Sequence, residues 1–120
     1  MAAGDKELEQ EFIASAITHH ELTDAGDSKG SKAAHKKAVS AMKKMRQRPD
    51  KGESFLKEAI RHPHANVRLW AATYLLPIDP PTALARLKTI IESRDDCPWQ
   101  VRGQAEAVID LWKKGQLELI

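Results

Sequence analysis

The sequence contains one cysteine, Cys97, and only six aromatic residues among 120: three Trp, two Phe and one Tyr. A single cysteine excludes an internal disulfide and fits a reducing compartment. Aromatic and β-branched residues favour strands, so their scarcity disfavours a β-sheet. No apolar run approaches the roughly 18 residues of a membrane-spanning helix. The first residues, MAAGDKELEQ, lack the apolar segment of a signal peptide. We therefore expect a cytoplasmic protein that does not enter the membrane.

Motifs of common catalytic sites are also missing. The sequence has no glycine-rich phosphate loop, no GxSxG and no pair of carboxylates in a recognisable setting. Cys97 has no histidine near it in the sequence, which disfavours a nucleophile. The chain has five histidines, namely His19, His20, His35, His62 and His64. None of them has the helical spacing of a paired metal ligand, so we expect solvated turn residues. The sequence thus predicts no enzyme, no metal and no cofactor.

The composition favours one helical domain. The chain is 42% hydrophobic and 30% charged, which is ordinary for a globular domain of 120 residues. Ala is abundant, and apolar residues recur at helical spacing along most of the chain. We predict a single all-α domain, residues 1–120, with about six helices in antiparallel pairs.

Six helical segments follow from this spacing and from the turns between them. We expect a hairpin within residues 1–50, two helix pairs within 51–114 and a tail at 115–120. The helices are expected at Asp5 to about Leu22, Ser31 to about Arg48, Gly52 to His62, His64 to Pro77, 81–93, and 98 to about Lys114. The expected caps are Asn66 or a neighbour for the fourth helix, Asp79 for the fifth, and Asp95 or Asp96 for the sixth, which Gly115 ends.

The segment 64–77, HANVRLWAATYLLP, is apolar nearly all the way round a helical wheel. Only Arg68 and Thr73 interrupt it. A helix without a polar face is usually buried, so we place this one centrally, with neighbours on at least two sides. Trp70, Tyr74 and Trp112 are expected in the core.

A repeat links this helix to the last one. Val67-Arg68 recurs as Val101-Arg102, 34 residues later, and VRLWAATYLL aligns with VRGQAEAVID. Periods of this length are typical of stacked helix pairs. A helix, a short turn with Asp or Pro, and then Val-Arg-x-x-Ala opening a second helix resemble a HEAT-like repeat. The match covers residues 52–114 as two repeats and 5–48 loosely.

VRLWAATYLLPIDP also resembles a small bacterial family of HEAT-like domains of uncharacterised function. This resemblance implies a short αα-superhelix, a HEAT-like solenoid, that serves as a protein-binding scaffold. Gly103 and Gln104 depart from the pattern, where bulkier residues are usual. Several small helical-repeat families also act as immunity or antitoxin-like proteins that occlude one cognate partner, which is the alternative function.

Four residues are candidates for partner contact: Arg68, Trp99, Arg102 and Glu106. In HEAT-like proteins the matching arginine commonly bonds an Asp in a neighbouring turn, so the resemblance gives both arginines a structural alternative. On the wheel Trp99 lies with Arg102 and Glu106, and an exposed Trp beside Arg is typical of binding hot spots. Equally, Trp99 could fold over the preceding helix end.

Charge is unevenly distributed along the chain. Residues 1–28 hold seven acids and one Lys, whereas residues 29–51 hold nine bases and one acid. The basic segment 29–48 suggests nucleic-acid binding. It has no aromatics for stacking on bases, and the acidic first helix can neutralise it across the hairpin. Nucleic acid is therefore disfavoured, and a non-enzymatic protein-binding module is the leading function.

Overall fold

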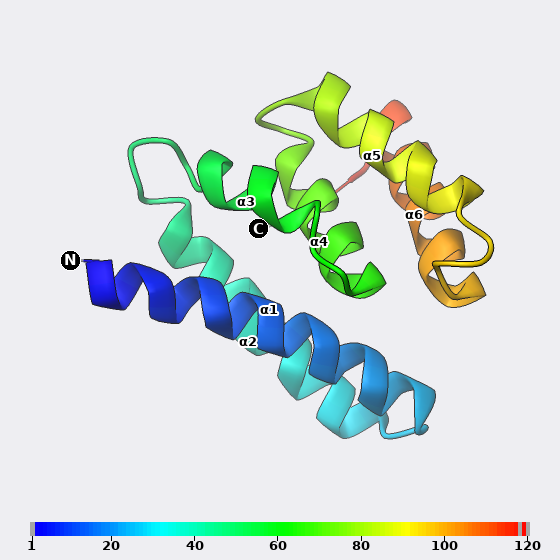
Figure 1. Ribbon diagram of the computed structural model, residues 1–120, viewed down its shortest axis with the longest axis horizontal. Helices are drawn as coiled ribbons and strands as arrows, with labels where there is room; N and C mark the ends of the chain where they lie inside the picture. The colour runs from blue at the N-terminus through cyan, green and yellow to red at the C-terminus, as the bar shows by residue number, and fades with distance from the viewer. Residues whose placement is uncertain (1, 118, 120) are drawn as a thin grey trace. The chain divides into compact units, whose positions relative to one another are not determined.

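The structure, a computed structural model, describes residues 2–117 and 119, with side chains from Lys6 onward. These residues form six α-helices and no strand, which confirms the predicted all-α class (Figure 1). The helices are α1 Ala2–Asp24, α2 Ser28–Met45, α3 Glu53–Ala59, α4 Ala65–Leu75, α5 Pro80–Glu92 and α6 Trp99–Lys113. The chain divides into two compact units, Met1–Phe55 and Leu56–Ile120. Stacking of the helices into a superhelix stays a prediction.

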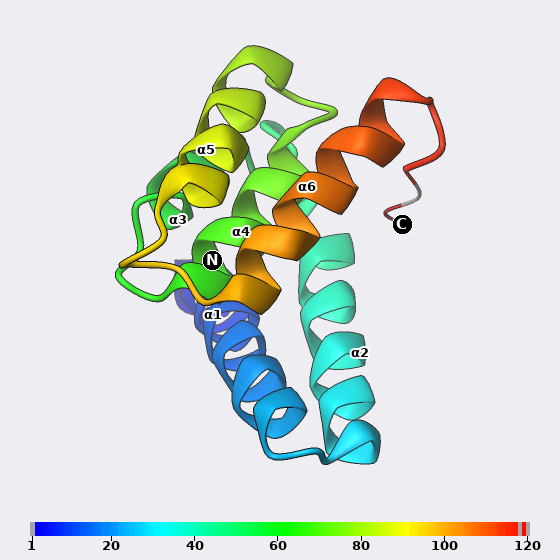
Figure 2. The same cartoon turned by 90° about the vertical axis from the view of Figure 1, so that its right-hand side faces the viewer.

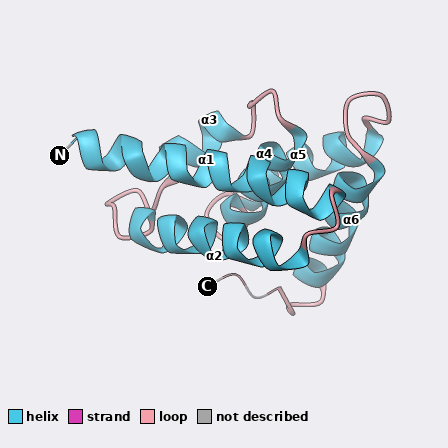
Figure 3. Ribbon diagram, turned by 90° about the horizontal axis from the view of Figure 1, so that it is seen from below, coloured by secondary structure: helices cyan, strands magenta, loops and turns pink. Residues whose placement is uncertain are grey.

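The first unit is built on an antiparallel hairpin of α1 and α2, which lie side by side (Figure 3). The buried side of α2 consists of small and flexible side chains, as expected from the sequence: Ala34, Ala38, Ala41, Met42 and Met45. Small side chains allow two helix axes to approach closely. From α1, the buried Phe12 packs edge-on against Phe55, with ring centroids 5.6 Å apart.

The turn between α1 and α2 sets where the second helix begins. Gly26 has a φ of +80°, a conformation that glycine adopts without strain. The Asp27 carboxylate then accepts a hydrogen bond from the Gly30 amide at 3.0 Å and caps α2. Helix α2 therefore starts at Ser28, three residues before the predicted position, and it ends at Met45 instead of about Arg48.

In the second unit, α4 contacts both α5 and α6, and these two helices contact each other (Figure 2). Eight of the eleven residues of α4 are buried, so the predicted burial of this helix and its contacts with two neighbours are confirmed. Trp70 is buried and Tyr74 is half-buried. Trp112 is also only half-buried, contrary to the prediction, because it lies in the last turn of α6 beyond Ile109, the last buried residue of that helix.

The helix ends agree with the sequence at α5 and after α6. Asp79 caps α5 by accepting a hydrogen bond from the Thr82 amide at 3.4 Å, and the Thr82 hydroxyl also donates to the carboxylate at 2.8 Å. Gly115 follows α6 with a φ of +69°, and its amide bonds the Trp112 carbonyl, which is a glycine-terminated helix end. The expected Asp cap of α6 is wrong, since Pro98 occupies that position without a side-chain bond.

None of the helices in residues 2–117 is both long and apolar enough to cross a lipid bilayer.

Candidate partner-binding surface

Two histidines shape the turn that precedes α4. The His62 Nδ1 accepts a hydrogen bond from the His64 amide at 3.0 Å, and the His64 Nδ1 accepts one from the Asn66 amide at 3.2 Å. A ring nitrogen that accepts is unprotonated, so each imidazole acts here as the short polar side chain of a turn or a cap. His64, not Asn66, is thus the cap of α4, and neither histidine is simply solvated.

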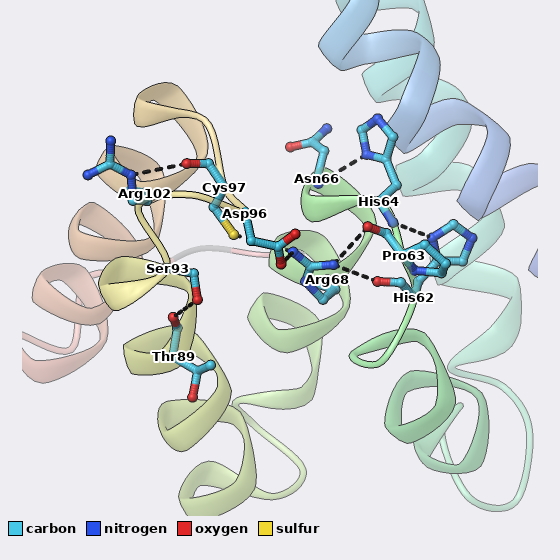
Figure 4. A network of polar contacts seen from close by, with 10 residues as sticks. All are labelled: His62, Pro63, His64, Asn66, Arg68, Thr89, Ser93, Asp96, Cys97 and Arg102. Atoms are coloured by element: carbon cyan, nitrogen blue, oxygen red, sulfur yellow. Dashed lines mark hydrogen bonds and ion pairs between the residues drawn. The ribbon is translucent and has the colours of Figure 1, made fainter.

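Arg68 connects this turn to the one that precedes α6. Its Nη1 donates to the carbonyl oxygens of His62 and Pro63, both at 2.8 Å. Its Nη2 donates to Asp96 Oδ2 at 2.8 Å and to Cys97 Sγ at 3.3 Å (Figure 4). Only 11% of the Arg68 side chain is exposed. The pairing with Asp96 is the structural role that the HEAT-like resemblance implied for this arginine.

Arg102 approaches the same turn from the other side. Its Nε donates to the Cys97 carbonyl oxygen at 3.1 Å, and Asp95 and Asp96 are not its partners (Figure 4). Cys97 itself is buried, so its thiol is held between the helices and away from solvent. The two arginines therefore converge on one residue, Cys97, but only Arg68 bonds a carboxylate.

Trp99 lies directly after this turn, at the first position of α6. It is 71% exposed, which rules out the alternative in which it folds over the preceding helix end. Glu106 is also exposed, two turns further along the helix. Trp99 and Glu106 therefore remain available for contact with another molecule.

A shallow hollow of about 550 Å³ lies along α6 and the adjoining part of α5. Its lining residues are Ile91, Gly103, Glu106, Ala107, Ile109, Asp110 and Lys113. Of the four predicted site residues, only Glu106 lines it. Sequence reasoning missed Gly103 and Ala107 as surface features, although two small residues four positions apart on a polar face were the available signal.

The hairpin of the first unit carries its charges differently from expectation. Arg48 Nη1 lies 3.0 Å from Glu9 Oε2, which is one ion pair between its basic and acidic segments. The six lysines of α2, by contrast, form no ion pair with any residue that the structure describes. The mutual neutralisation predicted for the two helices is thus not achieved through contacts of these lysines.

The remaining histidines lie on the facing helices of the hairpin. The rings of His19 in α1 and His35 in α2 have centroids 6.1 Å apart. Burial lowers the pKa of His19 from its usual value, and the nearby charges of His35 and His20 lower it further. Among the described residues, no three His, Cys, Asp or Glu side chains lie close enough together to hold a metal ion.

Comparison with known proteins places the chain in a family without assigning an activity. No curated protein and no solved structure matched it. One family model matched residues 6–112, which is most of the chain. The chain therefore belongs to the DUF2019 family, described as a domain of unknown function.

Proposed function

We propose that the chain is a non-enzymatic protein-binding module, and that its contact surface is the outer face of α6. This face comprises Trp99, Gly103, Glu106, Ala107 and Asp110, which recur about one turn apart. The exposure of Trp99, 71%, carries the proposal. A large aromatic side chain in water gains much from burial, and Trp is among the residues most enriched at the centres of protein interfaces.

The rest of this face complements Trp99. Gly103 has no heavy atom within 4 Å of where a Cβ would lie, so a partner's backbone can approach α6 closely there. Ile91 and Ile109 supply apolar area within the hollow, while Glu106, Asp110 and Lys113 supply polar groups at its edge. An apolar centre with charged groups around it is the usual composition of a protein interface.

Two arginines, Arg68 and Arg102, hold the turn that precedes this surface. Arg68 and Arg102 both bond Cys97, which is two residues before Trp99. A turn fixed in this way presents the Trp99 backbone in one orientation, so less conformational entropy is lost when a partner binds. We therefore assign Arg68 a positioning role, and Arg102, which is half-buried, a role at the margin of the contact surface.

We also infer that α4 and α6 are the second helices of two HEAT-like repeats. Val67 and Val101 are both buried, and Ala71 and Ala105 are both fully buried, as equivalent core positions of two repeats should be. Arg68 spans from the turn of one repeat to the turn of the next. In a helical-repeat scaffold, contact surfaces are commonly extended faces of this kind, which supports protein binding over catalysis.

The test is affinity capture from the source cell with four forms of the protein, followed by titration of each retained protein. Trp99→Ala should lose affinity by about 30-fold or more, as a hot spot does. Gly103→Leu should also weaken binding, because it fills the hollow. The control is Leu111→Ala, which removes an exposed apolar residue of α6 outside the hollow.

The control should retain the partner, and the melting temperatures of Trp99→Ala and Leu111→Ala should stay close to that of the wild type. Gly103→Leu should melt somewhat higher, because leucine favours a helix more than glycine does. A partner bound equally by the wild type and Trp99→Ala would show that the contact surface lies elsewhere. Loss of folding in Trp99→Ala would show that this residue supports the fold.

A further inference from the structure

Helix α2 has an uncompensated positive face. Its 18 residues include six lysines and no acidic residue, and all six lysines are exposed. They are Lys29, Lys32, Lys36, Lys37, Lys43 and Lys44. On a helical wheel centred on the buried Ala38, four of them share one arc of about 60° on the exposed side: Lys29, Lys32, Lys36 and Lys43. We call these four residues the lysine row.

The acidic residues of α1 do not reach this row. Glu11 and Lys37 line the same hollow between α1 and α2, so Lys37 lies on the flank that borders α1. Lys44, seven residues later, shares that flank. The lysine row occupies the opposite part of the helix surface and has no ion pair with a described residue. Its charge is therefore available to an anion outside the chain.

The first three lysines of the row oppose the stability of their own helix. Lys29 lies in the first turn of α2, where the helix dipole favours negative charge. Lys29 and Lys32 are three residues apart and Lys32 and Lys36 four apart, spacings at which like charges repel. A helix selected only for folding would place acidic residues among these lysines. The repulsion is relieved when a polyanion binds.

We propose that the lysine row binds the phosphate backbone of duplex nucleic acid without regard to sequence. The row extends over about 21 Å of helix axis, because Lys29 and Lys43 are 14 residues apart and each residue of an α-helix rises about 1.5 Å. Each strand of a duplex carries one phosphate for about every 3.4 Å of the duplex axis, so a row of this length spans about six base-pair steps. Lysine contacts to phosphates position a protein on the duplex but do not distinguish bases.

Other polyanions fit this face less well. An interfacial membrane helix inserts an apolar side, and the apolar side of α2 is buried within the protein. Single strands are held by aromatic stacking, and α2 contains no aromatic residue other than His35. An acidic protein would need an apolar anchor beside the charges, and the row offers only Ala33 and the half-buried Val39. Binding to the phosphates of a duplex requires only positive charge on the protein.

The test is the affinity of the full chain for a labelled 20-base-pair DNA duplex, measured by fluorescence anisotropy from about 50 to 200 mM salt. The wild type should show a slope of log affinity against log salt of about −3 to −4, as expected for four phosphate contacts. The triple variant Lys32→Gln/Lys36→Gln/Lys43→Gln should reduce the magnitude of this slope by about three. Its affinity at the lower salt concentrations should fall at least tenfold.

A charge-matched control separates this site from general positive charge. Lys6→Gln/Lys88→Gln/Arg94→Gln removes three exposed cations elsewhere in the chain, and its slope should stay close to that of the wild type. Equal losses in the two triple variants would overturn the proposal. So would tighter binding of polyglutamate, or of phosphatidylserine-containing vesicles, than of the duplex.

A measurement on the unmodified protein tests the same assignment without relying on variants that fold. On addition of the duplex, amide chemical shifts should change mainly within residues 29–43. Changes concentrated outside this range would overturn the assignment. Circular dichroism should show the α2 triple variant folded, with a melting temperature equal to or above that of the wild type, because the lysine repulsion is removed.

Discussion

Arg68 Nη2 lies 2.8 Å from Asp96 Oδ2, and the two side chains differ sharply in environment. The Arg68 side chain is 11% exposed, whereas that of Asp96 is 72% exposed. An ion pair with one partner in water contributes little to stability. The bonds from Arg68 to the carbonyl oxygens of His62 and Pro63 involve a guanidinium that is largely shielded from water, so they contribute more to stability than the ion pair does.

We therefore predict unequal effects from removing the two partners. Arg68→Ala should lower the free energy of unfolding by about 2–3 kcal/mol, because it removes several charge-assisted hydrogen bonds. Asp96→Ala should lower it by less than about 1 kcal/mol. Urea denaturation followed by circular dichroism measures both. Equal losses would show that the ion pair with Asp96, and not the bonds to the two carbonyl oxygens, supplies the stability that Arg68 provides.

Ala71 tests the packing of α4. Its side chain is completely buried, so Ala71→Asp places a carboxylate where water cannot reach it. The cost of burying such a charge is several kcal/mol, comparable with the whole stability of a small domain. Ala71→Asp should unfold the protein or produce an aggregated product. The matched control is Ala85→Asp on the exposed side of α5, which should fold cooperatively with only a small loss of stability.

His19 should make the stability of the hairpin depend on pH. Its pKa is lowered in the folded protein by burial, and then by His35 and His20. Between the folded pKa and the unfolded value of 6.5, the unfolded chain binds more protons at this residue, so stability is lost as the pH falls below about 6.5.

The measurement is the free energy of unfolding at pH values from about 7.5 to 5, a range that brackets the pKa of a histidine in the unfolded chain. His19→Gln should flatten this dependence. His62→Gln removes a histidine from the turn before α4 and does not alter α1, so it should leave the His19 contribution in place. An unchanged slope in His19→Gln would show that another group causes the pH dependence.

Asp79 should contribute in a separate and more acidic range. The Thr82 hydroxyl bond and the contact with Lys57, at 3.2 Å, lower the pKa of this carboxyl below its usual 3.8. Its stabilising effect is present above that value and is lost as the pH falls through the folded pKa. Asp79→Ala should lower the melting temperature at neutral pH, because the cap of α5 is lost.

Asp79→Asn separates the cap from the charge. Asparagine also caps helices, so this variant should keep most of the melting temperature at neutral pH. Its melting temperature should, however, no longer show the decrease below about pH 3.8 that protonation of Asp79 causes in the wild type. A loss as large as that of Asp79→Ala would show that the charge contact with Lys57 matters more than the cap.

The sequence alone determined the helices and the burial of α4. Periodicity of apolar residues reports which side of a helix avoids water, and this depends on neighbours within about one turn. The Asp79 cap and the Gly115 helix end are equally local, because the residue type and its position beside a helix suffice to predict them. The resemblance to HEAT-like repeats offered pairing with a nearby Asp as the structural alternative for both arginines, and Arg68 makes that contact.

Only the tertiary structure decided how groups distant in sequence meet. Arg68 and Arg102 occupy equivalent positions in sequence, yet one bonds Asp96 and the other a carbonyl, because each contact depends on distances across a turn to within an ångström. The exposure of Trp99 depends on whether a neighbouring helix covers it, which its own position on the wheel does not fix. The acidic and basic helices pair along the hairpin, but the geometry of α2 directs its lysine row away from α1, so charge balance in the sequence does not become ion pairs in the fold.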